Sequence, residues 1–288
     1  MKDGICMRNA ALAGATLLAG LLILFGTGCN KLKSRDNMNK GVAAFKNAKY
    51  ADAVNSFQEA IALDADNPNA RVYLAIAYMM QWIPGAESPE NAQFASKARE
   101  EFNKVLEKDA NDTTALQYMA SLAYNEATSL PPDQKLAKLD EAASWNHKLV
   151  AADPKSRDGF YSLGVIDQNK FYPALMIARV NLKMKPEEPG PLKDKKVKAE
   201  LAAKYAAIID DGVQNLQKSL DIDKENDDAM AYMNLLIRER ADLADTPGDY
   251  KKQIEVADNW LQKALDTKKV KAERNEKKNA GGIIQEAK

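Results

Sequence analysis

Residue types that carry enzyme chemistry are scarce in this sequence. It contains one histidine and two cysteines, and aromatic residues make up only 7% of the chain. So few side chains leave little material for a protein-only metal site, a redox pair or a Ser/His/Asp relay. The 41 basic and 41 acidic residues cancel. This balance argues against a nucleic-acid partner, because proteins that bind nucleic acids usually carry a large excess of lysine and arginine.

The overall composition predicts a folded protein. The chain has 288 residues, of which 45% are apolar and 28% are charged. That length is enough for one extended or two compact globular units. The apolar content is too high for a chain that is disordered over most of its length.

The first residues have the pattern of an export signal. Lys2 and Arg8 precede an uncharged stretch over residues 9–30, whose centre is rich in leucine. A short positive flank followed by an apolar run is typical of a segment that directs export. The run ends in Gly-Thr-Gly-Cys at residues 26–29, which resembles the cleavage box of bacterial lipoproteins, although Gly26 stands where those boxes usually carry leucine.

This resemblance implies that Cys29 becomes the lipidated first residue of the mature chain. Residues 1–28 are then a signal peptide, residues 29–36 are a lipidated linker, and the mature chain has no free thiol, which suits the periplasm. Two alternatives stay open: residues 1–28 are an uncleaved membrane anchor, or they are an ordinary secretory signal followed by an incidental cysteine. All three place the rest of the chain on the periplasmic side of a bacterial cell envelope, and Asn30 after the cysteine favours the outer membrane.

Beyond Lys40 the apolar residues recur at intervals of three and four, which predicts helices throughout. The chain also resembles itself in five successive segments, as expected of a repeat protein. The segments span residues 37–67, 68–112, 113–156, 157–226 and 227–267. The first four end in turns that begin with an aspartate, at Asp64, Asp109, Asp153 and Asp223.

The spacing of small residues in these segments resembles that of the tetratricopeptide repeat (TPR), in which two antiparallel helices pack closely. Small residues recur on the first helix at Gly41, Ala75, Ala120 and Gly164, and on the second at Ala53, Ala98, Ala142, Gly212 and Ala257. Larger residues, expected to fill the seam with the following repeat, are Phe57, Phe102, Leu216 and Leu261. In segment three Asn146 replaces the seam residue, and we expect Trp145 to pack there instead. The resemblance implies an all-α TPR-like solenoid of about five helical hairpins over residues 37–267.

Two further features of the repeat region bear on function. A long insertion at 171–196 begins with apolar residues, and Pro173 is compatible with the first turn of a new helix. The insertion is either an arm that docks onto a partner or a helix that covers exposed apolar surface. Residues 268–288 form a basic capping helix and tail, in which we expect Gly281 and Gly282 to end the helix.

No catalytic motif is present, so we expect a non-enzymatic protein without cofactor or metal. In TPR proteins the first helices line a concave groove. The residues at those positions that we predict to bind a peptide are Val72, Ile76, Met79, Met80, Tyr124, Asn125, Tyr161, Val165 and Asn169. Asn125 and Asn169 occupy equivalent positions, where each amide offers a donor and an acceptor to a peptide backbone.

The sequence therefore predicts a scaffold, tethered to a membrane, that binds other cell-envelope proteins or peptides and is of the kind seen in bacterial envelope lipoproteins. Envelope assembly or a secretion complex is the setting that this resemblance implies. The alternative is a small-molecule binding protein or hydrolase that uses a pocket formed by the 171–196 insertion.

The tether itself can be tested. If lipid on Cys29 holds the protein to the membrane, the Cys29→Ser variant moves to the soluble fraction, and the intact mass of the mature wild-type chain shows cleavage before Cys29 plus the mass of acyl chains. Membrane association that persists in the variant would favour the uncleaved anchor.

Overall fold

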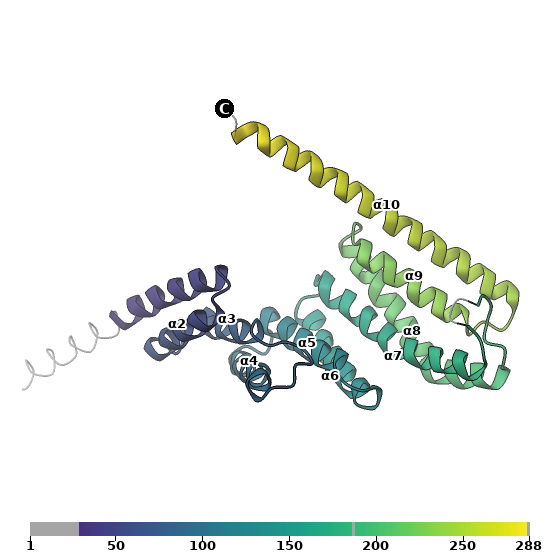
Figure 1. Ribbon diagram of the computed structural model, residues 1–288, viewed down its shortest axis with the longest axis horizontal. Helices are drawn as coiled ribbons and strands as arrows, with labels where there is room; N and C mark the ends of the chain where they lie inside the picture. Colours follow the sequence, from purple (N-terminus) through teal and green to yellow (C-terminus); the bar gives the residue numbers. More distant parts are fainter. Residues whose placement is uncertain (1–28, 186–187, 287–288) are drawn as a thin grey trace, which may run out of the picture. The chain divides into compact units, whose positions relative to one another are not determined.

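The computed structural model describes residues 29–185 and 188–286, and every regular element in them is helical (Figure 1). The chain divides into two units, Met1–Tyr118 and Met119–Lys288, with the boundary inside helix α5 (Thr113–Thr128). The predicted all-α fold of TPR-like helical hairpins is confirmed. The predicted signal peptide or anchor, residues 1–28, lies outside the described residues.

The first unit contains a helix over residues 29–46, followed by α2 (Tyr50–Leu63), α3 (Pro68–Met79) and α4 (Pro89–Lys108). Two fully buried seam residues make equivalent contacts with the next helix. The rings of Phe57 and Tyr73 lie 5.6 Å apart between centroids, as do those of Phe102 and Tyr118. Residues 29–36, expected to be a linker, belong to the first helix, where Ser34 is buried and its hydroxyl donates to the Ala60 carbonyl at 2.8 Å.

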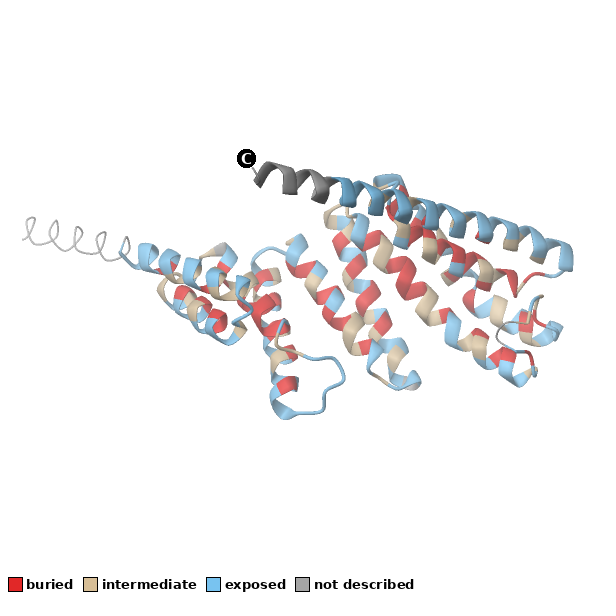
Figure 2. Cartoon of the chain, turned by 45° about the horizontal axis from the view of Figure 1, so that its top comes forward, coloured by how far each residue is buried: buried red, intermediate tan, exposed pale blue. Residues whose placement is uncertain are grey.

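The second unit contains the rest of α5, followed by α6 (Pro132–Ala152), α7 (Arg157–Asn181), α8 (Lys195–Ile222), α9 (Asp227–Ala241) and α10 (Pro247–Glu286). Each helix of this unit from α6 onward packs against the next, and α7 also contacts α9. Buried side chains line the faces where the helices meet, whereas the outer side of α10 is mostly exposed (Figure 2). The largest fully buried residues here include Phe171, Ile209 and Leu216.

The four aspartate-led turns share one geometry, which explains the regular return of the chain. In each, the aspartate carboxylate accepts a hydrogen bond from the backbone N–H two residues later, as short polar side chains do in tight turns. The bonds run to Asp64 from Asp66 (3.3 Å), to Asp109 from Asn111 (2.9 Å), to Asp153 from Lys155 (3.0 Å) and to Asp223 from Glu225 (3.0 Å). The residue after each turn caps the next helix. These caps are Asn67, Asp112, Ser156 and Asn226.

The expectation that Pro173 starts a new helix is wrong, because α7 continues through it to Asn181. Phe171, Leu175 and Ala178 recur on one side of the helix and are all buried in the core. Their packing outweighs the lost hydrogen bond and the clash that proline introduces inside a helix. Pro173 itself faces outward and is exposed.

The loop that follows α7 is held in place by Arg179. Its guanidinium donates to the Asp242 carboxylate at 2.6 Å and to the backbone carbonyls of Lys185 and Glu188. Leu192 then donates its N–H to the Asp242 carbonyl at 2.9 Å. The later part of the insertion is therefore tied to the turn between α9 and α10.

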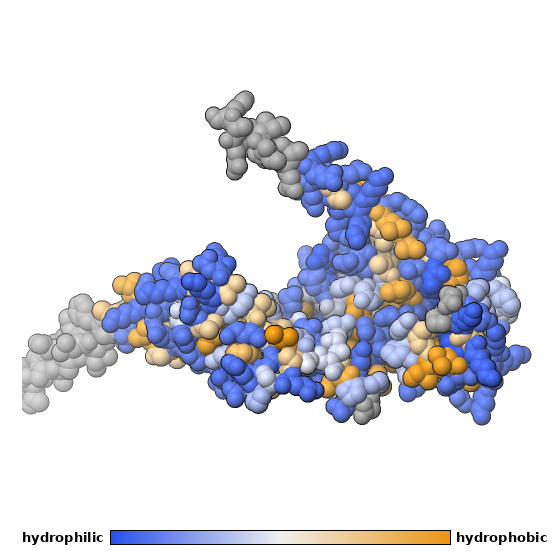
Figure 3. Space-filling view, viewed as in Figure 1, coloured by the Kyte–Doolittle hydropathy of each residue, from blue (hydrophilic) through white to orange (hydrophobic). Residues whose placement is uncertain are grey.

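Three other expectations change in the second unit. Leu261 is 39% exposed rather than packed in a seam, since no helix of the described residues follows α10, and apolar patches lie along α10 (Figure 3). Asn146 itself is buried at its seam position, where its amide donates to the Ala142 carbonyl at 3.0 Å, while Trp145 is only half-buried. The helix does not end at Gly281 and Gly282, because α10 extends to Glu286.

The predicted small residues lie where helices approach most closely. A Cβ atom on Gly41 would come within 2.4 Å of the Phe57 ring. One on Gly164 would lie 2.4 Å from Leu216 Cγ and 3.1 Å from the Gly212 carbonyl oxygen. At both positions a larger residue therefore requires the opposing side chain or its helix to shift.

The contact at Gly164 predicts that Gly164→Ala lowers the free energy of unfolding by about 1–3 kcal/mol through overpacking. This loss exceeds the gain of about 1 kcal/mol that alanine brings to a helix. Urea denaturation measures it. In the matched control Gly248→Ala, the nearest atom to the new Cβ is Thr246 Oγ1 at 3.6 Å, so we expect no loss. Equal losses at the two positions would contradict the close approach.

Candidate functional site

Three tyrosines from the first helices of successive hairpins form one surface of the second unit, which we name the tyrosine face: Tyr124 of α5, Tyr161 of α7 and Tyr232 of α9. The rings of Tyr161 and Tyr232 meet edge to face, with centroids 5.7 Å apart and planes at 81°. Asn169 Nδ2 lies 3.4 Å from Tyr124 Oη. All three tyrosines are half-buried, so part of each ring remains in contact with solvent.

Partial burial changes the pKa of these tyrosines. Loss of hydration raises the pKa of Tyr124, Tyr161 and Tyr232 above the usual value, because the charged phenolate is disfavoured away from water. Tyr232 further raises the pKa of the other two through its own charge. The three hydroxyl groups therefore lie close enough to influence one another and stay protonated at neutral pH.

The predicted groove residues of this unit surround the tyrosine face. Val165 is buried beneath it, and Asn125 is half-buried on α5. The amide of Asn169 also donates to the Val165 carbonyl at 2.8 Å, so its nitrogen is engaged within the protein. The structure thus brings Tyr124, Tyr161, Val165 and Asn169 together, and it adds Tyr232, which sequence reasoning missed.

Two carboxyl groups are buried in α7 and α9, the helices that carry Tyr161 and Tyr232. Glu239 of α9 accepts a hydrogen bond from Gln168 Nε2 at 2.7 Å, while its other oxygen has no partner in the described residues. Asp167 of α7 is buried against Gly212 of α8 and also has one oxygen without a partner. Burial raises the pKa of Glu239 to about 8 and that of Asp167 to about 7.

The sequence did contain a signal for Asp167. It follows Gly164 by three residues, which places it on the helix face that packs against α8 rather than on a solvated face. An acidic residue at such an apolar position indicates a buried titratable group. The sequence does not show which residues bury Asp167, because they are distant in the chain.

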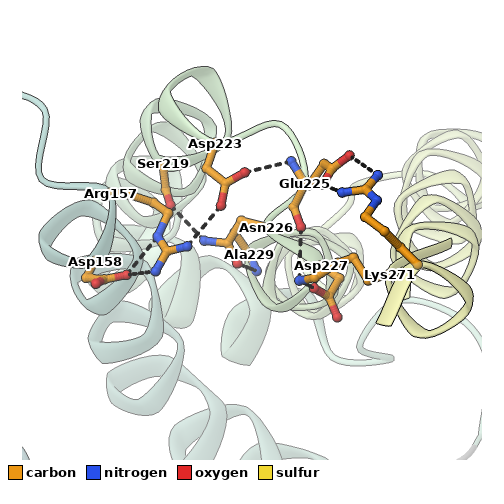
Figure 4. Close-up of polar contacts among 10 residues, drawn as sticks. Arg157, Asp158, Ser219, Asp223, Glu225, Asn226, Asp227, Ala229 and Lys271 are labelled. Atoms are coloured by element: carbon orange, nitrogen blue, oxygen red, sulfur yellow. Dashed lines mark hydrogen bonds and ion pairs between the residues drawn. The ribbon is translucent and has the colours of Figure 1, made fainter. Parts of the chain in front are cut away.

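A network of charged residues lies at the turn between α8 and α9 (Figure 4). Arg157 donates to Asp158 at 2.6 Å and to Asp223 at 2.9 Å. Two residues of α10 reach the same turn, where Lys271 pairs with Asp227 and Arg274 with Glu225. These contacts join the start of α7, the end of α8 and the start of α9 to the middle of α10.

The other predicted site residues lie in the first unit. Ile76 and Met79 are buried, Val72 is half-buried and Met80 is 43% exposed. Cys29, the predicted lipidation site, is exposed. Within residues 29–185 and 188–286 we find no helix with the length and apolar character needed to cross a membrane, and no group of three metal-ligating side chains.

The buried carboxyl of Asp167 predicts a pH-dependent stability. Between about pH 4 and pH 7 the folded protein retains a proton that the unfolded chain has lost, so stability falls as pH rises across that range and then levels off. Asp167→Asn removes this penalty. We expect its free energy of unfolding, relative to wild type, to increase by about 1–3 kcal/mol from pH 5 to pH 8.

Urea denaturation at the two pH values measures this difference, and Glu239 titrates alike in both proteins. Asp221→Asn is the matched control, since Asp221 is an exposed carboxylate on α8. A difference that stays constant between pH 5 and pH 8 would show that Asp167 does not titrate in this range.

Comparison with protein families matches residues 41–81 to the TPR repeat. Among solved structures, MamA from Desulfovibrio magneticus RS-1 is similar at 16% identity, over 83% of this chain and 96% of that one, with a TM-score of 0.49. TTC0263, a TPR protein of Thermus thermophilus, shares 14% identity over 73% of this chain and 98% of that one, with a TM-score of 0.40. YrrB, described as a TPR protein with an unusual peptide-binding site, shares 13% identity over 81% and 90%, with a TM-score of 0.43.

No curated protein sequence matches the chain. The family model covers the first helix from Gly41 onward together with α2 and α3, within an all-helical fold of the TPR-like solenoid class.

Proposed function

We propose that this protein is a membrane-tethered scaffold that binds other cell-envelope proteins or peptides through the tyrosine face. The observation that carries this proposal is the half-buried cluster of Tyr124, Tyr161 and Tyr232. Tyrosine is enriched at protein interfaces because its ring supplies a large apolar area and its hydroxyl remains able to form hydrogen bonds. A surface of this kind binds a protein segment without needing a catalytic group.

The neighbouring side chains suit the same role. Leu235 of α9 is 38% exposed, and Ser121 of α5 is exposed. Together with the tyrosines they combine apolar contact with polar groups, which is the usual composition of a peptide-binding surface. A fixed helical scaffold beneath the surface lowers the entropy lost on binding, because few of its own groups must become ordered.

The alternative function, a small-molecule site or hydrolase at residues 171–196, has less support. Four apolar residues of that insertion, Phe171, Leu175, Met184 and Leu192, are packed in the core and at most 3% exposed, whereas Tyr172, Ile177 and Val180 are exposed. Side chains of the protein thus occupy the space that a pocket would need.

The location of the protein belongs to the same proposal. A lipid on Cys29, or an anchor formed by residues 1–28, would hold the helical repeats at the periplasmic side of the envelope. For a lipid on Cys29, the membrane that carries the tether would be the outer membrane. The support is the charge and apolar pattern of residues 1–30. Tethering raises the effective concentration of the scaffold near other membrane-bound partners.

Site-specific photo-crosslinking in intact bacterial cells tests the scaffold function. A photoreactive amino acid is placed in the full chain at Ser121 or Leu235 of the tyrosine face, and at Ser144 of α6 as an exposed control. We expect adducts of one or a few defined masses at the first two positions only, each identified by mass spectrometry. The absence of adducts there, or an equal pattern at Ser144, would refute binding at this face.

A further inference from the structure

One carboxylate beside the tyrosine face has no ion-pair partner among the described residues. Asp228, in the first turn of α9, is exposed and forms no ion pair or hydrogen bond in the part of the chain that the structure describes. It stands four residues before Tyr232 on α9, so the two side chains are neighbours on one face of that helix, and the Tyr232 ring contacts that of Tyr161. In line with this position, its charge raises the pKa of both tyrosines. The negative end of this side chain is therefore available at the edge of the surface.

Three cations of the network at this turn pair with other acids. Arg157 is held between Asp158 and Asp223, and Arg274 pairs with Glu225. Lys271 is close enough to sense the charge of Asp228, but it forms its ion pair with Asp227 (Figure 4). The protein thus leaves one negative charge on this surface without a partner of its own.

The aromatic rings at this surface are likewise uncovered by lysine. Elsewhere in the second unit lysine ammonium groups lie over aromatic rings, with Lys148 4.0 Å from the Trp145 centroid and Lys263 4.3 Å from that of Trp260. No lysine among the described residues lies over Tyr161 or Tyr232. Aromatic rings next to a carboxylate attract cations, because the negative ring face and the carboxylate act in the same direction.

We propose that Tyr161, Tyr232 and Asp228 form a receptor for a lysine or arginine side chain of the protein segment that the tyrosine face binds. This inference rests on the proposed function and specifies the chemistry of its partner. The rings contact the cationic group and its aliphatic stem, while the carboxylate accepts hydrogen bonds from it. A segment rich in glutamate or aspartate is disfavoured at the same place, because its charge opposes that of Asp228.

The full chain in detergent micelles is titrated against three fluorescein-labelled peptides that differ only in one repeated residue: acetyl-(Gly-Lys-Ala)4-amide and its glutamine and glutamate counterparts. Fluorescence anisotropy at low and physiological salt gives the dissociation constants. We expect the lysine peptide to bind about tenfold more tightly than the glutamine peptide, and the glutamate peptide to bind most weakly.

The variant Asp228→Asn carries the main test, because Asp228 is exposed and its replacement leaves the core intact. We expect it to weaken binding of the lysine peptide about fivefold or more, and Tyr232→Leu to do the same. Glu255→Gln is the matched control: it removes one exposed carboxylate from α10, where Glu255 forms no ion pair among the described residues. Circular dichroism confirms that each variant remains helical.

Several results would overturn the receptor. They are equal binding of the lysine and glutamine peptides, no binding of any peptide, and an equal effect of Glu255→Gln and Asp228→Asn. Photo-crosslinking then separates the two proposals. Adducts at Leu235 that persist undiminished in Asp228→Asn would contradict the receptor but retain the scaffold, whereas a wild-type chain without adducts contradicts the scaffold itself.

Discussion

Close approach between neighbouring helices is the constraint on which the rest of this structure depends. At Gly41 and Gly164 there is no room even for a methyl group, because the side chains of Phe57 and Leu216 occupy that space. This contact sets the distance between the two helices of the pair and the rotation of each helix about its own axis. That fixed rotation determines which residues of the first helices face the neighbouring hairpins and which remain at the surface, and Tyr161 and Tyr232 belong to the second group.

The same packing sets a cost for the polar groups that lie inside it. Asp167 and Glu239 are buried between packed helices, and each retains one oxygen without a partner in the described residues. A neutral carboxyl is less costly there than a charged one, which is why burial raises both pKa values. Arg179 and Asp242 are buried as charged groups, because they pair with each other and also bind the backbone of the loop after α7. A buried charge in this protein is thus kept where it also positions a loop.

Local sequence patterns were enough to predict the helical repeats. The predictions that failed concern positions where contacts between residues distant in sequence decide the structure. The aspartate-led turns and the small residues of the first helices recur in the first four segments, so Asp64, Asp109 and Gly164 could be assigned to their roles without coordinates. At Pro173 the sequence predicts a helix boundary, because a proline normally marks one. The apolar residues that keep α7 helical there pack against a later helix. An example is Phe171, whose ring lies 5.4 Å from that of Tyr205. For the site, Tyr124 and Tyr161 follow from repeat positions, whereas the pairing of Tyr161 with Tyr232 and the isolation of Asp228 depend on side-chain placement that no sequence pattern encodes.

The distribution of charge gives the tyrosine face its character. The chain as a whole is neutral, yet neutrality is reached locally through ion pairs, such as those of Arg157, Lys271 and Arg274 at the turn between α8 and α9. Because those cations already have partners, Asp228 is left without an ion pair among the described residues. Surface ion pairs add little stability individually, but they fix which charges remain for a partner. Beside the rings of Tyr161 and Tyr232 the carboxylate outside these ion pairs is that of Asp228, so this part of the surface favours a cation.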